Sequence, residues 1–78
     1  SYPKYFIPSF WMKDMRFSLD IIWIKDDMII GFEKNVQPQP LGEELRVYQP
    51  ESFVNYVLEV PAGFVDGKGI KIGDKVEL

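Results

Sequence analysis

Two apolar runs separated by a pair of aspartates constrain the fold of this chain more than any other feature. The first run, Ile21–Ile24, is β-branched or aromatic at every position, and Asp26 and Asp27 follow it closely. The second run covers residues 28–32. Such residues favour strands, and a short polar pair between two strands is typical of a tight turn. We therefore predict a β-hairpin over residues 20–32.

The later part of the chain indicates more strands and one short helix. Residues 53–60 give the longest strand candidate, in which apolar side chains share one face. A helical turn is predicted near residues 61–68, because proline at its first position lacks only an N–H that the first turn leaves unused. Residues 70–72 and 75–78 flank a Gly-Asp turn and predict a second, shorter hairpin. The expected fold is mainly β, a small antiparallel barrel or clip-like sheet with one short helix.

Three further segments have weaker patterns. Residues 9–13 follow a proline and predict a short strand, and residues 45–48 predict an edge strand. Residues 35–42 contain two prolines and no periodicity, which indicates an extended loop. This loop is too short to be a linker between domains, and we expect residues 1–78 to form a single domain.

Composition excludes several chemistries. The chain has 78 residues with no cysteine and no histidine, so disulfides, thiolate catalysis, Ser-His catalysis and cysteine or histidine zinc sites are impossible within it. We predict no cofactor and no metal site. The net charge of −3 argues against a nucleic-acid partner. The apolar runs are far shorter than the roughly 20 residues that span a bilayer, so no transmembrane segment is predicted.

Three carboxylates border or interrupt apolar strands: Asp20, Glu33 and Glu59. If the strands pair, these side chains could converge, and oxygen ligands of this kind suit Mg²⁺ or Ca²⁺. Their spacing matches no recognised metal-binding loop, so a metal remains the weaker interpretation. The adjacent pairs Asp26-Asp27 and Glu43-Glu44 lie at turns or loop ends and are expected to be solvated.

The aromatic residues are interpreted mainly as core. Trp23 lies within the central apolar run and is expected to be buried, whereas Trp11 lies beside polar residues and could form part of a binding platform. The glycines of residues 67–73 precede a strand rather than a long helix, so they indicate turns and not a phosphate-binding loop.

One surface is predicted to carry function. Lys13 and Asp14 directly follow two large aromatic residues, and Glu59 interrupts an apolar strand. A charge in such a place needs a partner, so Lys13 is expected to pair with Asp20 or Glu59. Such a pair could equally serve only to stabilise the sheet. The predicted ligand-binding residues are Trp11, Lys13, Asp14, Asp20 and Glu59.

Three segments in order resemble one known family: residues 10–14 followed by 19–22, then 56–63, then 69–76. Their sequence and spacing closely resemble DUF192, a family of small bacterial and archaeal proteins often made with an export signal, and the resemblance covers nearly the whole chain. Relatives usually carry a further N-terminal strand, which implies that this chain is about the C-terminal two-thirds of the full domain. The chain departs from the family at Asp14, where asparagine is usual. It also lacks the Pro-Cys pair that many relatives have near residues 37–40.

Three functions remain open at this point. The first is a binding or accessory domain for a small molecule, a glycan or a protein, which the resemblance would place at the cell envelope. The alternative is a carboxylate-dependent hydrolase acting on a glycan or another extracellular polymer, with Asp20 and Glu59 as its acid–base pair. The third is a purely structural accessory domain. Geometry separates them, because a glycosidase needs two carboxyl groups about 5 to 9.5 Å apart beside a cleft.

Overall fold

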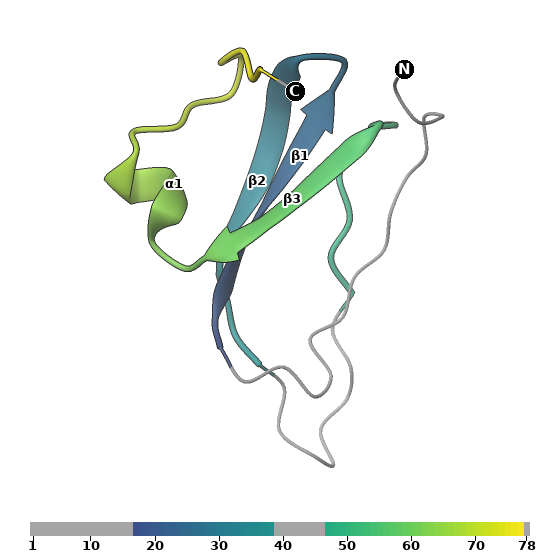
Figure 1. Ribbon diagram of the computed structural model, residues 1–78. Coiled ribbons are helices and arrows are strands. Elements are labelled where there is room, and N and C mark those ends of the chain that lie inside the picture. The colour runs from purple at the N-terminus through teal and green to yellow at the C-terminus, as the bar shows by residue number, and fades with distance from the viewer. Residues whose placement is uncertain (1–16, 39–46, 78) are drawn as a thin grey trace.

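Three antiparallel strands and one short helix form the part of the chain that the structure describes. The computed structural model describes residues 17–38 and 47–77. The strands are β1 (Leu19–Lys25), β2 (Met28–Val36) and β3 (Tyr56–Pro61), and the helix is α1 (Phe64–Gly67). The strand order is β2-β1-β3, with β1 at the centre (Figure 1). The predicted β-rich class with one short helix is confirmed, and the sheet is open rather than closed into a barrel.

The predicted hairpin is present as β1 and β2. Asp26 and Asp27 form the turn between them, and Asp26 adopts a left-handed conformation with φ of 59°. The buried side chain of Asn55 supports this turn, because its Oδ1 accepts a hydrogen bond of 2.8 Å from the Asp26 N–H. Aspartate and asparagine tolerate this conformation better than most residues. The turn therefore depends on a residue 29 positions away in the sequence.

Two irregularities shape the β1–β2 pairing. The register shifts between Trp23 and Ile24, and again between Leu19 and Ile21. At the second shift Asn35 has φ of 54°, the left-handed value. An extra residue in one strand leaves backbone groups without their ladder partners. The N–H of Asn35 is therefore available to a side chain, and this decides the role of Asp20 described below.

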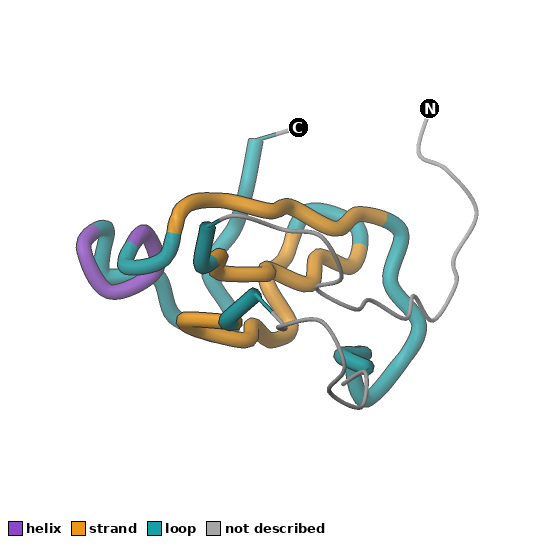
Figure 2. The backbone as a smooth tube through the Cα atoms, turned by 90° about the horizontal axis from the view of Figure 1, so that it is seen from below, coloured by secondary structure: helices purple, strands orange, loops and turns teal. Residues whose placement is uncertain are grey.

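The sheet has an apolar cluster on each face. Alternation along β1 sends its side chains to opposite faces. On the face named here the Trp23 face, the buried residues are Ile21, Trp23, Val36 and Val54. On the other, the helix face, they are Ile22, Ile24, Ile29 and Val65, the last of which belongs to α1. Figure 2 shows α1 beyond one end of β3, while the loop of residues 47–55 leads into the other end. Within residues 17–38 and 47–77, no helix is long and apolar enough to cross a membrane.

The third strand and the helix are both shorter than predicted. β3 begins at Tyr56 rather than at residue 53, so β2 is the longest of the described strands. Pro61 ends β3 instead of opening a helix, and α1 has only four residues. Gly63 separates the two elements with φ of 93°, a conformation that interrupts regular structure and suits glycine. The boundaries therefore follow from this glycine rather than from the proline.

The predicted C-terminal hairpin does not form. The Gly73-Asp74 turn is present, since the Asp74 N–H donates to the Lys71 carbonyl at 3.1 Å. After it, however, the chain pairs with β2: the Ile29 N–H donates to the Asp74 carbonyl at 2.9 Å, and its carbonyl accepts from Gly73 at 2.8 Å. Met28 and Lys75 form an isolated bridge next to them. An edge strand with unpaired backbone groups is a better partner than a three-residue segment, because its groups are already aligned.

Candidate functional site

Asp20 is buried and holds distant parts of the backbone together. Asp20 is only 1% exposed to solvent. One carboxylate oxygen accepts a hydrogen bond of 2.8 Å from the Asn35 N–H at the bulge, and the other accepts one of 2.9 Å from the Val65 N–H in α1. Asp20 thus joins the end of β2 to the helix. Its carboxylate is committed to main-chain donors, which is a structural task.

The environment of Asp20 favours its ionised form. Burial raises the pKa of this carboxyl group, because a charge is less well solvated inside the protein. Hydrogen bonds from the backbone of Asn35, Val65 and Gly63, and the positive charge of Lys34, act in the opposite direction and prevail. The net effect is a pKa below the usual value for aspartate. Asp20 is therefore a carboxylate at neutral pH and a poor general acid.

The carboxylates of Asp20 and Glu59 do not meet. In the β1–β3 register Glu59 lies opposite Ile21, whose side chain is on the Trp23 face, whereas Asp20 points to the helix face. Glu33 also lies opposite Ile21, from the other side. Glu33 and Glu59 therefore share one row of the Trp23 face, two strand spacings or roughly 10 Å apart. The three carboxylates do not converge on one point.

The remaining residues of the predicted surface, Trp11, Lys13 and Asp14, lie outside the described part of the chain. The predicted strand over 9–13 and the first half of the one over 45–48 lie outside it as well. The expected pairing of Lys13 with Asp20 or Glu59 therefore stays a prediction. Of the predicted site residues, the structure places only Asp20 and Glu59, and it places them on opposite faces.

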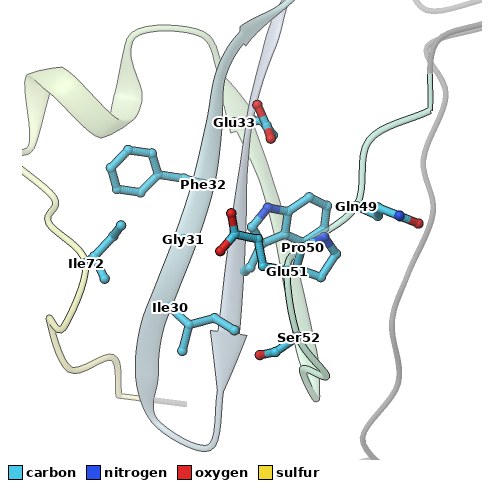
Figure 3. Close-up of a pocket in the computed structure, with 10 residues that line it drawn as sticks. Ile30, Gly31, Phe32, Glu33, Gln49, Pro50, Glu51, Ser52 and Ile72 are labelled. Carbon is cyan, nitrogen blue, oxygen red and sulfur yellow. The ribbon is translucent and has the colours of Figure 1, made fainter.

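The described residues form a hollow beside β2. Its volume is about 450 Å³, within the range of small-molecule sites. Part of its lining is apolar, from Trp23, Ile30 and Pro50, and part is polar, from Glu33, Gln49, Glu51 and Ser52. Figure 3 shows Glu51 and Ser52 on one side of β2, with Phe32 and Ile72 on the other. We call this feature the β2 hollow; it curves around the edge of the strand.

The floor of the β2 hollow is formed where β1 and β2 pair. Trp23 lies directly opposite Gly31 in the register, and a Cβ atom added to Gly31 would lie 3.4 Å from the indole Cδ1. The absence of a side chain at Gly31 therefore leaves space over this part of the strand. Trp23 is 3% exposed, so it is core, as the sequence predicted, and it meets the hollow only at its edge.

Sequence reasoning missed most of the residues that line this hollow. Glu33 was singled out, but Pro50, Glu51 and Ser52 come from a loop that carries no strand or helix pattern. One signal was available: a glycine in a strand often marks a place where another group approaches closely. Gly31 is such a glycine.

Metal ligands are not gathered in the described part of the chain. No group of three or more Asp, Glu, His or Cys side chains there could hold an ion. We expect Zn²⁺ neither to bind at micromolar concentration nor to raise the melting temperature, because the chain has no imidazole or thiolate. Isothermal titration calorimetry measures this directly, and Ca²⁺ should show at most weak binding. Micromolar or tighter Zn²⁺ binding to the monomer would contradict the expectation.

Comparisons with known proteins agree with this fold. A crystal structure of a "putative transcription regulator" from Sinorhizobium meliloti 1021 is 29% identical, with a TM-score of 0.84. A protein of unknown function from Novosphingobium aromaticivorans DSM 12444 is also 29% identical, with a TM-score of 0.82. Each match covers 95% of this chain but only 55% and 51% of the other chain, so this chain spans about half the length of either structure. No curated protein matches.

The sequence profile of one family matches the chain from end to end. The family is DUF192, described as "Uncharacterized ACR, COG1430", and the match covers residues 1–78. The motifs of residues 10–14, 56–63 and 69–76 predicted the same family. The chain therefore belongs to the DUF192 family.

Proposed function

We propose that this domain is a binding module whose ligand occupies the β2 hollow. The observation that carries the proposal is the lining, which places the accessible apolar side chains of Ile30, Phe32 and Ile72 in one hollow with the carboxylates of Glu33 and Glu51. Binding sites for small groups usually combine an apolar surface with a few polar groups that fix orientation. The β2 hollow has this combination.

The alternative of a carboxylate-dependent hydrolase has less support. Its acid–base pair would be Asp20 and Glu59, but these residues lie on opposite faces of the sheet. Asp20 is also buried and fully engaged by backbone N–H groups. A catalytic acid must reach the bond that it protonates. Binding therefore fits the described residues better than hydrolysis by this pair.

The name of the Sinorhizobium relative raises the question of regulation through DNA. For this chain we propose no direct contact with nucleic acid. Its net charge is −3, and the charged residues that line the β2 hollow in the described part of the chain are both acidic. Phosphate backbones are bound by clustered lysine and arginine. A regulatory role, if the chain has one, would act through a bound ligand or a partner protein. A location at the cell envelope stays a prediction from the family resemblance.

Nuclear magnetic resonance titration of the ¹⁵N-labelled chain tests this proposed function. The probes are glucose, N-acetylglucosamine, butylamine, butylguanidinium and butyrate, each added up to about 20 mM, because probes of this size reach only millimolar affinity. We expect at least one probe to shift the amide signals of Gly31, Glu33, Glu51 and Ser52 in a saturable manner. Saturable shifts confined to other parts of the sheet, or no saturable shift with any probe, would contradict the proposal.

A further inference from the structure

Among the described residues, the charged side chains that line the β2 hollow are negative, and no lysine or arginine lines it. Its charged lining residues, Glu33 and Glu51, are both acidic. Lys34, which follows Glu33 in β2, pairs with Asp66 of the helix, and its Nζ lies 3.1 Å from the Asp66 Oδ1. Glu59 adds a third negative charge to the same face, in the row of Glu33. The field over this face therefore favours a cationic group.

Neither carboxylate in the hollow has a partner among the described residues. Within residues 17–38 and 47–77, the side chains of Glu33 and Glu51 form no hydrogen bond and no ion pair. Glu33 is nevertheless half-buried, so part of its hydration shell is already lost. A half-buried carboxylate without a donor gains more from an incoming cation than a fully solvated one does.

The apolar part of the lining suits the aliphatic chain of a ligand. Of the apolar residues that line the hollow, Ile30, Phe32 and Ile72 keep accessible surface, whereas Trp23 and Pro50 are buried. Long cationic side chains bury their methylene groups along apolar surface while their charged ends reach polar groups. A ligand with a short alkyl chain and a charged end therefore matches the lining at both ends.

We propose that the β2 hollow binds a guanidinium group on an aliphatic chain; this inference rests on the proposed function of the hollow. A guanidinium fits better than an ammonium for two reasons. It is planar with five donors in a fixed fork, so a single group offers donors to more than one acceptor of the lining. It is also less strongly hydrated, so it loses less on entering a partly apolar hollow. The group can come from a small molecule or from an arginine of a partner protein.

The test compares four probes on the full 78-residue chain by the same amide titration. They are butylguanidinium, butylamine, neutral butylurea, and the blocked peptide acetyl-Gly-Arg-Gly-amide. We expect butylguanidinium to bind in the hollow with a Kd on the order of 1 mM, several-fold more tightly than butylamine, and butylurea to bind at least about tenfold more weakly. Binding should weaken as salt is added. Peptide binding at least as tight as that of butylguanidinium supports a protein arginine, and exclusion of the peptide supports a small molecule.

Matched variants assign the effect to the hollow. Glu33→Gln and Glu51→Gln should each weaken butylguanidinium binding by about tenfold, because each removes one charge-assisted hydrogen bond. Glu59→Gln removes the same charge from the same face outside the hollow and should change the Kd by less than about twofold. Thermal unfolding shows whether each variant folds.

Three outcomes overturn the inference. They are equal binding of butylurea and butylguanidinium, unchanged affinity in the Glu33→Gln and Glu51→Gln double variant, and occupation of the hollow by saccharide or butyrate probes alone. In each case a probe still binds at Gly31 and Ser52, so the hollow is still a binding site but its ligand is not a guanidinium group. Absence of any binding in the hollow would contradict both the proposed function and the proposed ligand.

Discussion

Replacing Trp23 with alanine should lower the free energy of unfolding by about 3 to 5 kcal/mol, the usual cost of removing a large buried aromatic side chain. The indole is 3% exposed and packs against Ile21, Val36 and Val54. Its cross-strand neighbours are Gly31, which has no side chain to fill the space, and Val57, whose side chain is small. A cavity would therefore remain. Total stabilities of small domains are about 5 to 15 kcal/mol, so this change removes much of the stability available.

Chemical denaturation followed by circular dichroism measures this effect. Phe53→Ala is a suitable control, since Phe53 is also aromatic but is 57% exposed, and its loss should cost no more than about 0.5 kcal/mol. Trp23→Phe should fall between the two variants because it keeps part of the apolar volume. A loss below about 1 kcal/mol for Trp23→Ala would mean that the indole is not core. It would make Trp23 a candidate for an aromatic binding platform.

The sequence was most informative where structure is determined locally. The hairpin follows from two apolar runs and an Asp-Asp turn, all within residues 20–32, and it was predicted correctly. The C-terminal pairing was not, because Ile29 bonds to Gly73 and Asp74, more than forty positions later. A short segment gives no sign of which edge it will join. The turn residues predicted the turn at Gly73-Asp74, but they did not predict that the segment at this turn pairs with β2.

In the candidate site, too, local features were predictable from the sequence and contacts between distant residues were not. Asp20 stood out in the sequence because it begins an apolar strand, but the role of its charge depends on donors 15 and 45 positions away, Asn35 and Val65. Periodicity along one strand does not reveal a bulge in its partner. Likewise, Glu33 borders an apolar run, whereas Glu51 lies in a loop without a pattern, and only the fold brings both to one hollow.

Asp20→Asn should lower the free energy of unfolding at neutral pH by about 2 to 4 kcal/mol, because a buried charged acceptor is replaced by a neutral group that can accept at only one of its two ends. The amide end would face the N–H of either Asn35 or Val65, leaving that buried donor without an acceptor. Asparagine has nearly the same volume as aspartate, so packing changes little. Asp66→Asn is the control: Asp66 is exposed, its ion pair with Lys34 is on the surface, and its loss should cost at most about 1 kcal/mol.

The pH dependence of this difference identifies its cause. The pKa of Asp20 is lower in the folded protein than in the unfolded chain, chiefly because backbone N–H donors outweigh the effect of burial. A lowered pKa stabilises the fold fully above the unfolded value, and the stabilisation is lost as the pH falls through the folded value. Wild-type stability should therefore show this loss below about pH 4, while the Asp20→Asn variant lacks it, so the two curves should converge in acid. If instead the difference in free energy of unfolding between wild type and Asp20→Asn stays constant from about pH 7 to about pH 2.5, then Asp20 contributes through shape and neutral hydrogen bonds rather than through its charge.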